Sequence, residues 1–402
     1  MKDDTTLLSG PRDALLHAVQ TVLGIVLRRH TLPILNHLLI RGDAGVVTLT
    51  ASDLECQIGS ACSAAVQPGA QAFTVTVAAH KLADILRALP PGADVRLARS
   101  RGRAAQLTLT SGRSRFTLQT LPAEDFPMVR AATPAAQLQL PQATLSTLLD
   151  RVAFAMASHD IRYYLNGVLI VVDRHELTAV GTDGNRLAMA QATLASPDDS
   201  DDSANDNDND NASTSTSTST DRLEFILPRK TVLELQRLLR GAPAGDLHLA
   251  LSAAQAVFNF GSLTFISKLI EGRYPDYRRV VPQGHPHSLT LDAAVLRASL
   301  ERAALLTSDK FRGVRLVLQP GLLSIVASNA AQEEALEEMA VDHDGPALDI
   351  GLNVGYLIDL LVGGNADDGG TVQVALRDAQ SALLFTRPGE PGFCYVVSPM
   401  RI

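Results

Sequence analysis

Apolar and polar positions along the chain repeat one pattern three times. In each copy, apolar residues at helical spacing give way to strand-like runs at matching places, which predicts a helix followed by two strands. In the first copy the helical positions are Ala14, Leu15, Ala18, Val19 and Val22, and the strand runs are 35–40 and 49–53. In the second copy they are Leu145, Leu148, Leu149 and Val152, followed by 165–171 and 177–183. In the third copy they are Val295, Leu296, Ser299 and Leu300, followed by 314–318 and 322–329.

Each copy continues with a strand that runs directly into a second helix, at 73–89, 223–239 and 348–361. The copies recur at intervals of about 125 residues once one inserted segment is set aside, which is the size of a whole domain and far above that of solenoid repeats. The pattern predicts an α+β fold with three similar domains in tandem, at residues 1–131, 132–286 and 287–402. Tandem copies of this kind favour a curved or ring-like assembly.

The inserted segment, residues 197–221, consists mainly of Asp, Asn, Ser and Thr in low-complexity runs. Such a composition cannot bury a core, so we expect a disordered loop. Asp206, Asp208 and Asp210 resemble the start of a calcium loop, but the glycine and the distal glutamate of that loop are missing. No metal site is predicted here.

The formal net charge of −8 argues at first against a nucleic-acid partner. However, the inserted segment holds eight aspartates, and the rest of the chain has equal numbers of acidic and basic residues. The six predicted helices carry more Lys and Arg than acids, an excess that fits either a nucleic-acid footprint or ordinary solvated helix faces.

Other features indicate a cytoplasmic protein. No apolar run approaches the ~20 residues of a membrane-spanning helix, and the start of the chain lacks the features of a signal peptide. Cys56, Cys62 and Cys394 show neither a paired framework nor the spacing of a zinc site, so we expect buried thiols in a reducing compartment.

Catalysis has little support in the sequence. Asp183, Gly184, Asn185 and Arg186, or the ten histidines, are candidate acid, base or phosphate-binding groups, but there is no P-loop, HExxH or GxSxG motif. Asp183 also has counterparts in Asp53 and Asn329, which indicates a turn residue shared by the three copies. We therefore predict a binding protein without a catalytic site or cofactor.

Seven strings of the sequence, in the same order, resemble the β subunit of bacterial DNA polymerase III, the sliding clamp family. They are spread along nearly the whole chain, and only the acidic insertion has no counterpart in the family. They are RHTLPILNHLL from Arg29, SGRSRF from Ser111, SHDIRYYLNGVLI from Ser158, TDGNRLA from Thr182, SKLIEGRYPDYRRVVP from Ser267, SDKFRGVRL from Ser308, and YVVSPMRI from Tyr395.

This resemblance implies a head-to-tail homodimer that closes into a ring, with helices lining the hole and sheets outside. Double-stranded DNA would pass through the hole without sequence-specific contacts, because weak phosphate contacts permit sliding. The implied partners are the α subunit of DNA polymerase III, the clamp loader, and other polymerases and repair proteins with clamp-binding motifs. The alternative is a clamp-like hub that binds peptides without threading DNA.

The resemblance implies three groups of site residues. Those that would contact DNA are Arg29, His159, Tyr163, Tyr164, Arg229, Lys230 and Arg279. His159 stands where the family commonly has glutamine, and core packing is the alternative role for the two tyrosines. Those of the partner-peptide pocket are Leu165, Thr182, Leu187, Pro275, Arg279, Val280, Asn353, Tyr356, Val396, Pro399, Met400 and Arg401, with Ser398 in place of a frequent methionine. Those of the dimer interface are Arg113, Arg115, Phe116, Leu305, Leu306, Glu333, Glu334, Glu337 and Glu338.

Overall fold

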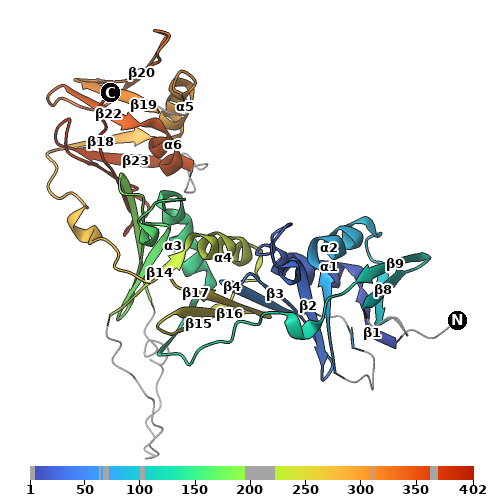
Figure 1. The fold of residues 1–402 in the computed structure, drawn as a ribbon. Coiled ribbons are helices and arrows are strands. Elements are labelled where there is room, and N and C mark those ends of the chain that lie inside the picture. Colours follow the sequence, from blue (N-terminus) through green and yellow to red (C-terminus); the bar gives the residue numbers. More distant parts are fainter. Residues whose placement is uncertain are drawn as a thin grey trace, which may run out of the picture. The chain divides into compact units, whose positions relative to one another are not determined.

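The computed structural model describes residues 5–62, 65–66, 72–99, 105–194, 222–308, 312–362 and 370–402, with 65–66 as backbone alone. The predicted insertion, 197–221, lies outside the described residues. The chain folds into two compact units, Met1–Ala143 with Arg237–Leu269, and Thr144–Gln236 with Ile270–Ile402. Each unit is described by itself below (Figure 1).

The first unit holds a five-stranded sheet with the order β5-β1-β7-β8-β9 and an eight-stranded sheet with the order β10-β15-β16-β17-β4-β3-β2-β6. All pairings between neighbouring strands are antiparallel. The strands are β1 Thr5–Pro11, β2 His37–Asp43, β3 Val46–Ser52, β4 Cys56–Cys62, β5 Ala65–Val66, β6 Phe73–Ala78, β7 Asp94–Arg99, β8 Gln106–Ser111, β9 Ser114–Gln119, β10 Ala136–Pro141, β15 Asp246–Leu251, β16 Gln255–Phe260 and β17 Leu263–Lys268.

The second unit holds an eight-stranded sheet with the order β14-β11-β12-β13-β25-β24-β23-β18 and a four-stranded sheet with the order β21-β20-β19-β22. These pairings are antiparallel as well. The strands are β11 Gly167–Asp173, β12 Glu176–Thr182, β13 Arg186–Thr193, β14 Leu223–Pro228, β18 His287–Asp292, β19 Gly313–Gln319, β20 Leu322–Ser328, β21 Glu334–Ala340, β22 Leu348–Asn353, β23 Thr371–Leu376, β24 Leu383–Thr386 and β25 Cys394–Val397.

The second repeat contributes to both eight-stranded sheets. Its strand β17 pairs with β4 of the first repeat, and its strand β13 pairs with β25 of the third repeat. The two halves of the second repeat thus extend sheets that belong to different neighbours, and this explains why the boundary between the two units falls within that repeat.

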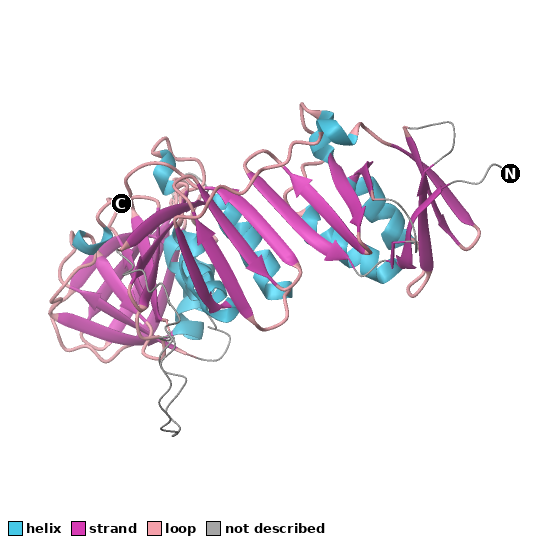
Figure 2. Cartoon of the chain, turned by 90° about the horizontal axis from the view of Figure 1, so that it is seen from below, coloured by secondary structure: helices cyan, strands magenta, loops and turns pink. Residues whose placement is uncertain are grey.

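Two helices accompany each repeat, as the sequence pattern predicts. They are α1 Arg12–Leu23 and α2 Ala79–Ala88, α3 Gln142–Val152 and α4 Arg229–Gly241, and α5 Ala293–Ala304 and α6 Val354–Val362. Figure 2 shows helices and strands as separate layers within each unit. The predicted apolar positions of α1, α3 and α5 form the buried faces of these helices, except Ala14, which is partly buried, and Val295, which is 52% exposed. Within the described residues, no helix is long and apolar enough to cross a membrane.

Two predicted strand starts are wrong. Leu35 and Leu165 belong to short 3-10 helices, η1 Pro33–Asn36 and η4 Tyr163–Leu165, and β2 and β11 begin two residues later. Both leucines are nevertheless buried. An apolar residue that anchors a turn into the core has the same sequence signature as the first residue of a buried strand.

The predicted turn residue is confirmed in all three repeats. Asp53 Oδ1 accepts hydrogen bonds from the amides two and three residues later, at 2.9 and 2.5 Å. Asp183 Oδ1 does the same at 2.9 and 3.1 Å. Asn329 Oδ1 accepts from the amides two and four residues later, at 3.0 and 3.1 Å. These side chains shape turns between strands, a role that the local sequence alone explains.

A hydrogen bond also recurs in the three repeats. It joins the fourth residue of β6, β14 or β22 to the segment at the C-terminal end of the same repeat, which crosses the strand at this point. Thr76 Oγ1 donates to the Leu121 carbonyl at 2.7 Å, and the Ile270 amide donates to the carbonyl of the fourth residue of β14 at 3.0 Å. The Met400 amide donates to the Gly351 carbonyl at 2.8 Å. A Cβ at Gly351 would lie 2.4 Å from the Met400 carbonyl oxygen, so the C-terminal tail can cross β22 only because glycine stands there.

The three cysteines are buried thiols, as predicted. Burial raises the pKa of Cys394 to about 11, so this thiol is protonated and unreactive at neutral pH.

Candidate functional site

A cleft with a free volume of about 200 Å³ lies in the second unit. Its lining includes six of the predicted pocket residues, namely Leu165, Thr182, Leu187, Pro275, Val280 and Val396. Leu187 and Val396 come together because β13 and β25 pair in a register that sets them opposite each other. The buried side chains of Leu165, Leu187 and Val396 form an apolar core with Tyr274 and Tyr277. An apolar cleft of this kind can hold one or two apolar side chains of a ligand.

The turn between β12 and β13 forms one wall of the cleft and is held by its own side chains. Thr182 Oγ1 donates to the Arg186 carbonyl at 2.5 Å and accepts from the Gly184 amide at 3.1 Å. Gly184 has a φ of +93°, and a Cβ there would lie 2.8 Å from a guanidinium nitrogen of Arg162. The Asn185 carbonyl accepts the Ser398 amide at 2.9 Å, so the turn is also tied to the end of β25.

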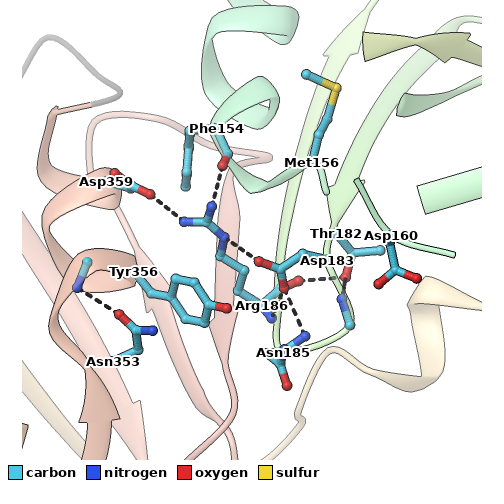
Figure 3. A network of polar contacts seen from close by, with 12 residues as sticks. Phe154, Met156, Asp160, Thr182, Asp183, Asn185, Arg186, Asn353, Tyr356 and Asp359 are labelled. Atoms are coloured by element: carbon cyan, nitrogen blue, oxygen red, sulfur yellow. Dashed lines mark hydrogen bonds and ion pairs between the residues drawn. The ribbon is translucent and has the colours of Figure 1, made fainter. Parts of the chain in front are cut away.

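Arg186 is the most connected side chain of the cleft (Figure 3). Its Nε donates to Asp183 at 3.0 Å, its Nη1 donates to Asp359 at 2.6 Å, and its Nη2 donates to the Phe154 carbonyl at 2.6 Å. The guanidinium carbon lies 4.4 Å from the centre of the Tyr356 ring. With the side chain only 9% exposed, the charge of Arg186 is neutralised by carboxylates and by the face of an aromatic ring.

The loop before β11 forms an adjoining part of the rim, where Arg162 is fixed by Asp160 and also donates to the Asp183 carbonyl at 3.2 Å. Asp160 accepts from the Arg162 backbone amide, Nε and Nη2 at 2.8, 2.9 and 2.7 Å. These hydrogen bonds, those of the Arg162 side chain above all, lower the pKa of Asp160 to about 2. Asn166 closes the loop from the other side, since its side chain binds the backbone of Asp160 at 2.9 and 2.8 Å. The rim is therefore rigid and partly cationic.

Six predicted pocket residues do not line this cleft: Arg279, Asn353, Tyr356, Pro399, Met400 and Arg401. Asn353 accepts from the Gly355 amide at 2.9 Å, at the start of α6. Tyr356 lies beneath Arg186, and partial burial raises the pKa of its phenol, which is therefore neutral at physiological pH. Tyr356 thus acts on the cleft through Arg186.

The structure adds lining residues that the sequence did not assign to the pocket: Arg162, Tyr164, Gly184, Asn185, Arg186, Tyr274 and Tyr277. All of them lie in three of the strings that carry the family resemblance, SHDIRYYLNGVLI, TDGNRLA and SKLIEGRYPDYRRVVP. The signal was therefore present in the sequence as neighbours of predicted residues. Ser398 also lines the cleft and brings a small polar side chain to it.

The residues predicted to contact DNA lie on the described surface with different degrees of exposure. Tyr163 is 59% exposed, whereas Tyr164 is half-buried against the cleft core, and their rings meet edge to face with centroids 5.9 Å apart. His159 is exposed in the same loop. The Arg229 amide, at the start of α4, donates to the Asn166 carbonyl at 2.9 Å, which brings α4 and the half-buried Lys230 next to this loop. A tyrosine pair and a helix N-terminus therefore share one surface of the second unit.

Two other predicted DNA contacts lie elsewhere. Arg29 is exposed in the first unit, in the segment between α1 and η1. Arg279 ends the short helix η6 Tyr277–Arg279 in the second unit, where its 86% exposed side chain pairs with Asp276 at 3.0 Å. Both guanidinium groups are accessible to a ligand from solvent.

The residues predicted for the dimer interface lie at two sheet edges, one in each unit. Arg115 and Phe116 are on β9, the edge of the five-stranded sheet, and Arg113 is in the turn before it. Glu334 and Glu338 are on β21, the edge of the four-stranded sheet, and Glu333 precedes it. Leu305 and Leu306 follow α5, and Leu305 is 80% exposed.

Glu337 of β21 has an arginine partner on α5 within the chain. Its carboxylate accepts two hydrogen bonds from Arg302 of α5, at 2.8 and 2.5 Å. The hydrogen bond from Arg302 lowers the pKa of Glu337. Because side chains alternate along a strand, Glu334, Leu336 and Glu338 point to the opposite face.

The chain was compared with known proteins. The family models for the N-terminal, central and C-terminal domains of the DNA polymerase III beta subunit match residues 8–130, 139–205 with 211–276, and 278–401. The beta sliding clamps of Pseudomonas putida and Escherichia coli K12 are 39% and 38% identical to the chain over 393 and 391 residues, which is 97% of the chain and 98% of each relative. The sliding clamp of Pseudomonas aeruginosa bound to griselimycin superposes with a TM-score of 0.87 at 38% identity, covering 99% of this chain and 100% of that one. The chain belongs to the DNA polymerase III beta subunit family.

Proposed function

We propose that this chain is the processivity factor of a bacterial replicase, a clamp that encircles duplex DNA and tethers the polymerase to it. The observation that carries the proposal is the match to all three clamp domains, together with an intact apolar cleft and two intact sheet edges. The protein acts by binding, without catalysis or a cofactor.

Ring closure joins β9 of one chain to β21 of a second chain. Both strands are sheet edges, and an edge strand presents unpaired backbone groups that a second chain can complete. Arg113 and Arg115 on one side and Glu333, Glu334 and Glu338 on the other supply opposite charges, which favour a head-to-tail contact over a contact between like edges. Two such contacts close a dimer.

Duplex DNA passes through the ring and is held by topology. Arg29, Arg229, Lys230 and Arg279 supply positive charge to phosphate oxygens, and His159, Tyr163 and Tyr164 add hydrogen bonds. Contacts with the backbone carry no sequence information, and a small number of them remains weak enough at physiological salt to permit sliding.

The cleft is the docking site for partner peptides from the α subunit, the clamp loader, and other polymerases and repair proteins. Its apolar floor takes a hydrophobic anchor, and its rim of Arg162, Asn185 and Ser398 provides polar contacts. A relative that binds griselimycin, 38% identical over nearly the whole chain, supports ligand binding by this fold.

Retention on circular DNA tests the proposal. With clamp loader and ATP, the labelled protein is expected to stay on nicked circular DNA through gel filtration and to leave when the circle is linearised. Equal retention on both forms would contradict a topological link. A peptide-binding hub that does not thread DNA would bind griselimycin and partner peptides but would not be retained on either form.

A further inference from the structure

Asp359 holds a residue of the cleft although it does not line the cleft itself. Its carboxylate lies 2.6 Å from Nη1 of Arg186, which does line it. The Asp359 side chain is 47% exposed, so one face of this ion pair is open to solvent. Asp359 is on α6 of the third repeat, whereas Arg186 begins β13 of the second.

The orientation of Arg186 is determined by acceptors on three separate elements. Asp183 in its own turn holds Nε, the Phe154 carbonyl after α3 holds Nη2, and Asp359 on α6 holds Nη1. Tyr356, one helical turn before Asp359, supports the flat face of the guanidinium. Figure 3 shows the group enclosed between Asp359, Tyr356 and Asp183. The Phe154 ring also faces the guanidinium, with its centre 5.9 Å from the guanidinium carbon, but the nearer ring and the described partner of Nη1 both come from α6.

We propose that Asp359 is a positioning residue for ligand binding. Its carboxylate keeps the Arg186 guanidinium packed against α6, and the cleft therefore stays open and apolar. This inference rests on the proposed role of the cleft as a ligand site. Without the carboxylate of Asp359, Nη1 loses its anionic partner, and on the side of α6 the Tyr356 ring is the remaining described contact, so the guanidinium can rotate away from α6 about its contacts with Asp183 and Phe154. A charged group then enters a cleft whose floor is apolar, where an unpaired charge opposes the burial of an apolar ligand.

A second ion pair between the same two repeats provides a matched control. Arg151 of α3 pairs with Glu390 of the β24–β25 connection at 3.1 Å, and the two side chains are 21% and 19% exposed. Glu390 also pairs with Arg387, which donates to the Leu360 carbonyl near the end of α6. Arg151 and Glu390 do not line the cleft. Removing this pair weakens the contact between the repeats and leaves Arg186 and its partners in place.

The experiment compares griselimycin affinity, measured by calorimetry, for the full-length wild type, Asp359→Asn, Asp359→Glu and Arg151→Gln. We expect Asp359→Asn to weaken binding by about tenfold, the scale at which contacting charged groups are coupled. Asp359→Glu, which keeps the carboxylate, is expected to stay within about threefold of the wild type. Arg151→Gln is expected to lower the melting temperature as Asp359→Asn does but to bind normally.

Equal griselimycin affinity of the wild type and Asp359→Asn would overturn the positioning role. Equal losses of affinity in Asp359→Asn and Arg151→Gln would overturn it as well, because they would indicate a general effect of weakening the contact between the repeats. If Asp359→Asn does not fold, Asp359→Glu decides, because a loss as large as tenfold in that variant also contradicts the inference. A wild-type chain that does not bind griselimycin while still being retained on circular DNA would remove the ligand site and this inference but leave the clamp function standing.

Discussion

Leu187 lies opposite Val396 in the antiparallel pairing of β13 with β25, and both side chains form the floor of the cleft. Leu187 is 2% exposed. We expect Leu187→Ala to lower the free energy of unfolding by about 2 to 5 kcal/mol, as for other buried leucines. We also expect it to weaken griselimycin binding about tenfold, because the ligand loses its apolar floor. Denaturant unfolding and calorimetry measure the two effects.

Leu249→Ala provides the control for this variant. Leu249, on β15 of the first unit, is 3% exposed and does not line the cleft. The Leu249→Ala variant should lower the free energy of unfolding by a similar amount and leave griselimycin affinity unchanged. An equal loss of binding in both variants would show that destabilisation alone weakens the ligand site.

The helices and much of the sheet core can be predicted from the sequence because they depend on local periodicity. Leu15, Ala18, Val19 and Val22 recur at the spacing that one helix face requires, and the structure buries all four. Half of the predicted pocket residues line the cleft, but these were identified by the resemblance of their strings to a known family and not by periodicity.

The remainder of the cleft depends on register and on long-range pairing, which periodicity does not contain. Arg186 is an example, because its partners are 3, 32 and 173 residues away along the chain. The sequence presents it as a polar residue near a turn and as a candidate phosphate-binding group, without any of these partners. Only the pairing of β13 with β25 brings it next to α6 and turns Tyr356 from a lining residue into a support for Arg186.

The C-terminal tail is expected to be required for polymerase binding but not for the dimer. Removal of Met400 to Ile402 should abolish stimulation of the polymerase, because the family resemblance assigns Met400 and Arg401 to partner binding although they do not line the cleft. It should leave the solution mass unchanged, because the tail crosses β22 and not β21, the edge of the proposed seam. Gly351→Ala should act in the same direction, since its Cβ would displace the Met400 carbonyl. Primer extension and light scattering measure the two properties.

Gly370→Ala is the matched glycine variant for this test, because, among the described residues other than its chain neighbours, no atom lies within 4 Å of the position where its Cβ would be. It should support primer extension normally. Normal extension by Gly351→Ala as well would show that the position of the tail does not matter for the polymerase.

The proposed seam predicts a charge-reversal effect with partial rescue. Glu334→Arg should raise the dimer dissociation constant by about tenfold or more, because it faces Arg113 and Arg115 with like charge. Combining it with Arg113→Glu should restore part of the loss. Analytical ultracentrifugation at low and high salt measures the constants, and the difference should shrink as salt screens the charges.

Glu337→Gln should have a smaller effect on the dimer than Glu334→Gln, although both residues are on β21. Arg302 already occupies the Glu337 carboxylate within the chain. If Glu337→Gln is the more damaging variant, Glu337 must leave Arg302 when the ring closes, and the seam differs from the one proposed.

The rim of the cleft predicts a specific acid titration. Hydrogen bonds from the Arg162 side chain, and then from its backbone, hold the pKa of Asp160 at about 2, below its unfolded value of about 3.9. A group with a lowered folded-state pKa contributes stability above its unfolded pKa and loses it as the pH falls through the folded pKa, here from about 4 to about 2. Carboxyl NMR should give an Asp160 midpoint near 2, and Arg162→Gln should raise it. An unchanged midpoint in Arg162→Gln would contradict the assigned cause.

The last prediction concerns the insertion of residues 197–221, whose removal we expect to leave folding, dimerisation and loading nearly unchanged. The corresponding connections in the other repeats are short, with ten residues between β4 and β6 and seven between β21 and β22. A long surface insertion costs little closure entropy, about 0.6 kcal/mol for each doubling of its length. A variant that joins Ser196 to Arg222 leaves four residues between β13 and β14. These strands are three positions apart in the sheet, a span of about 14 Å, which a linker of four extended residues can cover.

Because the segment holds eight aspartates, its removal should strengthen DNA binding at low salt only if it lies near the DNA. Melting temperature, solution mass and DNA affinity at two salt concentrations test this, and a loss of the dimer or a drop of several degrees in melting temperature would show that the segment is structural.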